Sequence, residues 1–190
     1  MYAFHPRGYI FIWFIIQRKA GSQINRTVYR TEYYAVEEND SHEIVVFDQL
    51  PESASVVALH EGCLLLVRQY REAVDEMTWE LPGGTVRPGE EAAVAARREL
   101  EEEAGILCKD LSYMGSAYPM ASLANRKVHY FFTDAVKPDR ALDRRPDDDD
   151  VAAVWVPLRD VFRKVQQGSA DAMVGHGLLL GSLNGYISIE

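Results

Sequence analysis

The chain of 190 residues contains few cysteines, and their spacing excludes several kinds of structure. Cys63 and Cys108 are the two cysteines, they form no C-x-x-C pair, and no spacing typical of zinc ligands surrounds them. Small domains held together by disulfides need several cysteine pairs, which this sequence does not provide. We therefore expect two small buried thiols and a cytoplasmic location, where thiols stay reduced.

An excess of basic residues is also missing, because the formal net charge is −9. Proteins that bind nucleic acid generally need a basic surface to displace the counterions of the phosphate backbone. We therefore expect no nucleic-acid partner. A small phosphorylated substrate remains compatible with this charge, since a few arginines and a metal ion can hold it.

A hydrophobic run long enough to cross a membrane is absent as well. The apolar run Tyr9–Ile16 has eight residues, whereas a membrane-spanning helix needs about 20. No clear small-residue cleavage site of a signal peptide follows it. We therefore expect no membrane association and treat residues 1–25 as an N-terminal extension. Its apolar run is compatible with an extra strand, a dimer contact or a mis-assigned start codon.

Short segments rich in β-branched and aromatic residues alternate with helical patterns along the chain, which favours an α/β layered domain. Strands are predicted at Thr27–Val36, Glu43–Phe47, Ser55–Leu59, Cys63–Tyr70, Trp79–Leu81, Leu111–Ser116, Lys127–Thr133 and Val151–Val156. Helices are predicted from about Glu90, with Glu90 and Glu91 in the first turn, to Gly105, over Leu158–Gln167, and over about Asp171–Leu183.

The first of these helices carries a dense acidic patch. Glu99 precedes Glu102 by three residues and Glu103 by four, so the three carboxylates share one helix face. Like charges this close repel, and the C-terminal end of a helix is the unfavourable end for them. A hard divalent cation such as Mg²⁺, which prefers oxygen ligands, would compensate the charge. Gly83-Gly84 would let the backbone approach the same ligand closely.

The acidic patch is part of a longer pattern. From Gly84 to Ile106 the sequence reads G-x₅-E-x₇-R-E-L-x-E-E-x-G-I. This pattern resembles the signature of the Nudix hydrolase family at every specified position, and the resemblance covers most of the chain after about residue 26. It implies an α/β/α sandwich with a mixed sheet. It also implies hydrolysis of a nucleoside diphosphate linked to another group.

The resemblance also implies roles for individual residues. Mg²⁺, with Mn²⁺ as a possible substitute, would be bound by Glu99, Glu102 and Glu103 with help from the Gly83 carbonyl. Arg98 would fix the glutamates by salt bridges, and Glu90 would be a secondary or structural acid. The proton acceptor for the attacking water would be Glu102, Glu103 or a loop acid such as Asp150, at the end of the acidic run Asp147–Asp150.

The residues before the signature narrow the family further. The stretch "VRQYREAVDEMTWELPGG", residues 67–84, resembles the ADP-ribose pyrophosphatase branch. The resemblance implies that Arg71 and Arg68 contact phosphate or the terminal ribose, that Glu80 lies near the substrate or metals, and that Pro119 matches a characteristic proline. The pattern departs after that proline, because no glycine or acid occurs between Pro119 and Val128.

That departure keeps alternatives to ADP-ribose open. They are GDP-mannose or another nucleotide sugar, a nucleoside triphosphate, and a sensor that binds a nucleotide without cleaving it. We interpret His129 as a packed strand residue. Residues 26–54 match in position the small antiparallel β-region that this branch uses for dimer contacts, which implies a homodimer, and residues 55–190 would form the hydrolase domain.

Overall fold

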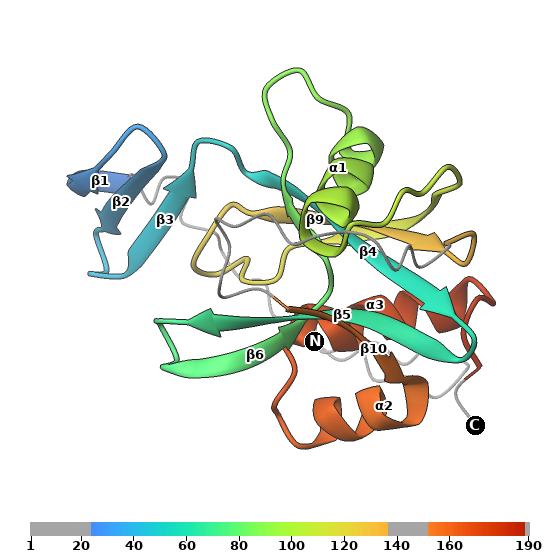
Figure 1. The fold of residues 1–190 in the computed structure, drawn as a ribbon. Helices are drawn as coiled ribbons and strands as arrows, with labels where there is room; N and C mark the ends of the chain where they lie inside the picture. The colour runs from blue at the N-terminus through green and yellow to red at the C-terminus, as the bar shows by residue number, and fades with distance from the viewer. Residues whose placement is uncertain (1–23, 137–151, 189–190) are drawn as a thin grey trace, which may run out of the picture.

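The computed structural model describes residues 24–136 and 152–188, which form ten strands and three helices (Figure 1). The strands are β1 Ile24–Arg30, β2 Tyr34–Asn39, β3 Ile44–Asp48, β4 Glu52–His60, β5 Cys63–Arg71, β6 Glu76–Glu80, β7 Gly83–Thr85, β8 Ser112–Ala117, β9 Lys127–Thr133 and β10 Ala152–Pro157. The helices are α1 Ala92–Ala104, α2 Leu158–Gln166 and α3 Ala172–Leu183. Within the described residues, no helix combines the length and the apolar character that crossing a membrane requires.

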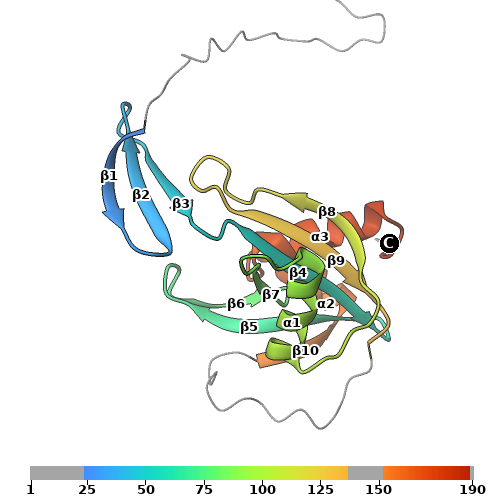
Figure 2. The ribbon, with the colours of Figure 1, turned by 90° about the horizontal axis from the view of Figure 1, so that it is seen from above.

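The first three strands form a separate antiparallel sheet in the order β1-β2-β3, which lies to one side of the larger sheet (Figure 2). The single strand predicted over Thr27–Val36 is wrong, because a turn at residues 31–33 divides it into β1 and β2. The Thr31 hydroxyl accepts hydrogen bonds from the backbone N–H groups of Tyr33 and Tyr34. Such local side-chain bonds compete with strand pairing and close a turn.

The larger sheet is mixed, with the order β10-β5-β4-β9-β8. The pairing of β4 with β9 is parallel, and the other pairings are antiparallel. β4 and β5 form a hairpin whose turn residues, Glu61 and Gly62, have φ angles of 47° and 75°. Two positive φ angles are typical of the two-residue turns that match the twist of a hairpin.

The larger sheet opens between β4 and β5. These strands pair at only two positions next to the hairpin turn. Farther along, β6 pairs with β5 and β7 pairs with β4, so that β6 and β7 occupy the two edges that the separation exposes. The end of β6 at Glu80 and the start of β7 at Gly83 therefore lie at this opening.

Helices cover both faces of the larger sheet, which confirms the predicted α/β/α sandwich (Figure 1). On one face, Leu100 of α1 packs into a core with Val56 and Phe131. On the other face, α2 and α3 contribute Val161 and Leu178 to a second core. Burial of such apolar side chains, at about 1.5–3 kcal/mol each, is the main force that holds helices and sheet together.

The helix of the acidic patch, α1, ends as its sequence predicts but begins later. Gly105 has φ 67° and forms the left-handed C-terminal cap, which glycine adopts without steric cost. The first helical residue is Ala92, so Glu90 and Glu91 precede the helix and the prediction that they form its first turn is wrong. Glu90 instead accepts a hydrogen bond from the backbone N–H of Arg87 at 2.9 Å, which closes the turn before the helix.

Candidate active site

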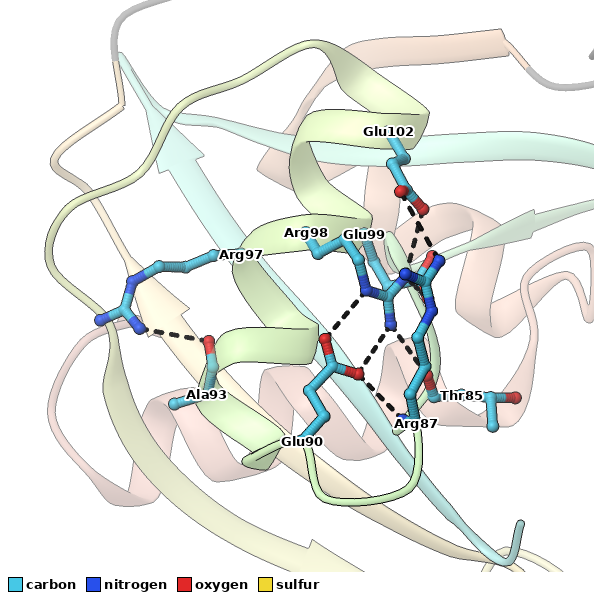
Figure 3. A network of polar contacts seen from close by, with 8 residues as sticks. All are labelled: Thr85, Arg87, Glu90, Ala93, Arg97, Arg98, Glu99 and Glu102. Carbon is cyan, nitrogen blue, oxygen red and sulfur yellow. Dashed lines mark hydrogen bonds and ion pairs between the residues drawn. The ribbon is translucent and has the colours of Figure 1, made fainter.

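Arg98 is the centre of a polar network on α1 (Figure 3). Its guanidinium donates from Nε and Nη2 to the two carboxylate oxygens of Glu90, at 3.0 and 3.1 Å. Nη1 donates to Glu99 Oε1 at 2.6 Å and to Glu102 Oε2 at 3.1 Å, and Nη2 also donates to the carbonyl of Thr85 at 3.0 Å. One side chain therefore fixes three glutamates and the end of β7, which suits the rigid fork of a guanidinium.

Glu103, in the last turn of α1, contacts the start of β7. Its Oε2 atom accepts a hydrogen bond of 2.9 Å from the backbone N–H of Gly83. Burial raises the pKa of Glu103 to about 7, the hydrogen bond from Gly83 opposes this rise, and the negative charges of Glu99 and Glu80 add to it. Several carboxylates are thus gathered in a place where water solvates them poorly.

The glycines beside the helix allow its carboxylates to approach the backbone. A Cβ atom added to Gly84 would collide with the carboxylate of Glu99. A Cβ atom added to Gly83 would collide with the carbonyl of Ala54 and lie 2.8 Å from the Cα atom of Ser55 on β4. Both positions therefore exclude any larger side chain while the present packing is kept.

Arg71 and Glu80 form a second network, at the opening between β4 and β5. The Arg71 guanidinium donates from Nε to Glu80 Oε1 at 2.6 Å and from Nη2 to Oε2 at 2.5 Å, and the Thr78 hydroxyl donates to Oε1. Burial alone would raise the pKa of Glu80, but the bonds from Arg71 and Thr78 outweigh it and lower the pKa. The positive charge of Arg71 also lowers the pKa of Glu103, so the two networks are electrostatically coupled.

The other predicted residues lie elsewhere. Arg68 pairs with Trp79 across β5 and β6, and its guanidinium carbon lies 5.6 Å from the centre of the indole ring. It is three residues from Arg71 on one strand, so the two side chains leave opposite faces. Pro119 follows β8 and lines two cavities, and no glutamate of α1 lines either of them. Asp150 is outside the described residues.

A metal ion is the group that the donor set suggests. Glu99 and Glu103 offer carboxylate oxygens on the same part of α1, and hard divalent cations prefer such ligands. Within residues 24–136 and 152–188, no group of three acidic, histidine or cysteine side chains is already arranged around one point. The carboxylate of Glu102 is bonded to Arg98 and lies 3.8 Å from Arg87 Nη2. The carboxylate oxygens of these residues are suitable ligands for a divalent cation. Glu102 would have to give up its hydrogen bond with Arg98 to bind the same cation through that oxygen.

Three residues near the site were missed by the sequence analysis. Thr78 bonds to Glu80, and its position two residues earlier on the same strand face could have indicated this. Asp171 is the N-cap of α3, and its charge raises the pKa of both Arg71 and Tyr130. No sequence signal joins Asp171 and Tyr130 to Arg71, since they come from distant parts of the chain.

Comparison with known proteins agrees with this geometry. The model of the NUDIX domain matches residues 49–174. Over 120 residues the chain is 32% identical to the ADP-ribose pyrophosphatase of Bacillus subtilis (strain 168), which covers 61% of this chain and 63% of that protein. It is 29% identical over 138 residues to the ADP-sugar pyrophosphatase of Mus musculus, covering 66% of this chain and 63% of that protein.

A solved structure, described as that of an ADP compounds hydrolase, superposes with a TM-score of 0.68. The superposition covers 85% of this chain and 94% of that chain, at 20% sequence identity. At this identity the likeness concerns the fold. The alignments with the two pyrophosphatases leave more than a third of each relative's length unmatched.

Proposed function

Because the chain belongs to the Nudix family, we propose that it hydrolyses the pyrophosphate bond of a nucleoside diphosphate derivative with the help of Mg²⁺. The substrate that we propose is ADP-ribose, cleaved to AMP and ribose 5-phosphate. The observation that carries the proposal is the packing of Glu99 and Glu103 against Gly83-Gly84, next to the paired Arg71 and Glu80. The similarity to the ADP-ribose pyrophosphatase of Bacillus subtilis supports the choice of substrate.

The residues of the acidic helix would hold the cation. Nudix hydrolases generally use a divalent metal. We assign it to Glu99, Glu102 and Glu103, with the Gly83 carbonyl as a further oxygen donor. When bound, divalent cations neutralise phosphate charge and lower the pKa of a water molecule for attack on phosphorus. Arg98 would hold Glu99 in position throughout, since its bond to Glu90 is independent of the cation.

The proton of the attacking water needs an acceptor within hydrogen-bond reach. Glu103 suits this role because its carboxylate is half-buried and is held in place by a hydrogen bond from the Gly83 N–H. Glu102 and Asp150 stay as the other proposed acceptors. Arg71, which is half exposed at the opening of the sheet, would bind phosphate or the terminal ribose while one edge of its guanidinium holds Glu80.

The three-stranded N-terminal sheet supports a second part of the proposal, a homodimer. Val28 and Tyr29 of β1 are 50% and 62% exposed, and Tyr33 and Tyr34 are also exposed. Exposed apolar and aromatic side chains gathered on one small sheet are typical of a contact surface. Light scattering after gel filtration should give twice the mass of one chain, as expected for a homodimer. We propose that this homodimer is cytoplasmic. A replacement of Tyr29 by Ser should shift the protein toward the monomer.

A substrate panel tests the reaction. Purified protein with Mg²⁺ is given ADP-ribose, GDP-mannose, other nucleotide sugars and nucleoside triphosphates, and the products are identified by mass. We expect AMP and ribose 5-phosphate from ADP-ribose, and no products after chelation of the metal. If GDP-mannose is cleaved as fast as ADP-ribose or faster, ADP-ribose is not the preferred substrate. Tight binding of ADP-ribose without any product would instead indicate a nucleotide sensor.

A further inference from the structure

Glu102 differs from the other two glutamates of the acidic patch because both of its carboxylate oxygens face an arginine (Figure 3). Oε2 accepts a hydrogen bond of 3.1 Å from Arg98 Nη1, and Oε1 lies 3.8 Å from Arg87 Nη2. Glu99 and Glu103 each keep one oxygen that forms no hydrogen bond within the described ranges of the chain. In this arrangement Glu102 is therefore the carboxylate with the least free oxygen for a cation.

The two arginines that face Glu102 are held very differently. The Arg98 side chain is 16% exposed and also binds Glu90 and the Thr85 carbonyl, so it is a fixed part of the network. The Arg87 side chain is 61% exposed, and its guanidinium makes no other ion pair or hydrogen bond among residues 24–136 and 152–188. Exposed ion pairs contribute little stability, because water solvates both charges. A cation can therefore take Oε1 of Glu102 at lower cost than Oε2.

The backbone of Arg87, in contrast to its side chain, has a defined position. The Arg87 N–H donates to Glu90 Oε2 at 2.9 Å, and the Arg87 carbonyl accepts a hydrogen bond of 2.9 Å from the Glu90 N–H. Pro88 follows, and a proline restricts the conformation of the residue before it. An exposed guanidinium thus turns about a fixed point beside the acidic patch. Its planar fork of N–H donors matches the oxygens of a phosphate group.

We infer that Arg87 exchanges partners when the cation and the substrate bind. It is the counter-ion of Glu102 Oε1 until a divalent cation takes that oxygen, and it then binds a phosphate group of the substrate. The inference rests on the proposed function, because it needs a cation at the acidic patch and a diphosphate on that cation. Ligand oxygens lie about 2.1 Å from Mg²⁺, so a phosphate on a cation at Oε1 is within reach of Arg87.

This exchange couples the two binding events. A cation at Oε1 neutralises the carboxylate that Arg87 faces, and the diphosphate offers the arginine a new negative partner. Cation and substrate therefore each favour the binding of the other through one side chain. Arg98 does not fit this role, since its bonds to Glu90 and Glu99 hold it in place.

Cation affinity tests the first half of the exchange without substrate or turnover. The protein is treated with a chelator and titrated with Mn²⁺, and the free ion is measured by electron paramagnetic resonance. Arg87→Gln removes the counter-ion of Oε1, so Mn²⁺ should bind about 3-fold more tightly than in the wild type. Arg87→Lys keeps a positive charge at this place and should bind Mn²⁺ as the wild type does. An unchanged or weaker affinity in Arg87→Gln would overturn the inference.

Arg97→Gln is the matched control for the loss of a positive charge. Arg97 is next to Arg98 in the chain, but its side chain points away from the glutamates (Figure 3) and donates to the carbonyls of Ala93 and Lys109. We expect Arg97→Gln to bind Mn²⁺ with the affinity of the wild type. Equal tightening in Arg97→Gln and Arg87→Gln would show that net charge, and no contact with Glu102, is responsible, and would reject the exchange.

Kinetics at saturating Mg²⁺ test the second half. Loss of the charge-assisted contact in Arg87→Gln should raise KM for ADP-ribose roughly 10-fold with little change in kcat. Arg87→Lys should recover part of this loss, and Arg97→Gln should keep the KM of the wild type. Arg87→Gln then binds the cation more tightly and the substrate more weakly, whereas damage to the fold would weaken both. An unchanged KM in Arg87→Gln would show that Arg87 does not bind the substrate.

The two proposals fail in different ways. If no nucleoside diphosphate derivative is hydrolysed but Arg87→Gln binds Mn²⁺ more tightly, the reaction is wrong and the counter-ion role of Arg87 stands. If ADP-ribose is hydrolysed but Arg87→Gln has the Mn²⁺ affinity and the KM of the wild type, the reaction stands and the exchange is rejected.

Discussion

The Oε2 atom of Glu103 accepts a hydrogen bond of 2.9 Å from the backbone N–H of Gly83, twenty residues earlier in the chain. This bond joins the last turn of α1 to the first residue of β7. It fixes a half-buried carboxylate at the opening of the sheet, beside the ion pair of Arg71 with Glu80. The helix therefore has a defined position relative to the strands that carry the rest of the candidate site.

Replacing Glu103 by Gln should abolish most of the activity and preserve the fold. The amide keeps an oxygen that can accept the Gly83 hydrogen bond, but it is a poorer metal ligand and cannot take up the proton of the attacking water. We expect kcat to fall about 100-fold or more, with an unchanged circular dichroism spectrum. Glu101→Gln is the matched control, since Glu101 is exposed on the same helix. Near-normal turnover in Glu103→Gln would contradict the assignment.

The two arginines of β5 should differ in importance. Arg71→Ala leaves the buried carboxylate of Glu80 without its main partner, so we expect a loss of about 1–3 kcal/mol in the free energy of unfolding and a higher KM. Arg68→Ala removes only a cation–π contact with Trp79, at about 0.5–1 kcal/mol, and should leave KM unchanged. Urea unfolding and steady-state kinetics measure both. A KM raised by Arg68→Ala alone would place the substrate on the other face of β5.

Stability in acid should depend on Glu90. Hydrogen bonds from Arg98 and from the Arg87 backbone lower the pKa of Glu90 from an ordinary value of 4.5 to about 2. A lowered pKa in the folded state stabilises the fold above pH 4.5, and this contribution is lost as the pH falls toward 2. Glu90→Gln should therefore be less stable than the wild type at pH 7, and the difference should shrink below pH 4. Thermal melts from pH 7 to pH 2 check this, and a constant difference would disprove it.

Two glycines of α3 should respond to alanine in opposite ways. An added Cβ at Gly175 meets only Val165, at 3.5 Å, so Gly175→Ala should gain about 0.5–1 kcal/mol of stability from lower backbone entropy in the unfolded chain. At Gly177 the same atom would lie 2.8 Å from Leu81 and 3.0 Å from Val57 in the core. Gly177→Ala should therefore lose about 1–3 kcal/mol. Equal effects in chemical denaturation would show that helix α3 packs differently.

The parts of the site that share one element could be predicted from the sequence. The spacing of Glu99, Glu102 and Glu103 determines that they share a face of α1, and Arg98 occupies the same turn. Gly105 likewise predicts the end of that helix. The shared face follows from the helical period, and the helix end follows from the left-handed conformation that glycine adopts at low cost. The turn that divides β1 from β2 was missed because aromatic and β-branched residues continue through it.

The sequence by itself determined the family pattern, the alternation of strands and helices and the acidic helix face, because these depend on contacts within a few residues. Only the tertiary structure decided which distant residues meet. The separation of β4 from β5 brings Arg71, Glu80 and Gly83 to Glu103, and the strand alternation turns Arg68 away. The ring contact of His176 on α3 with Tyr130 on β9 likewise requires α3 to lie against β9. Strand register and helix packing set these distances, and neither follows from local periodicity.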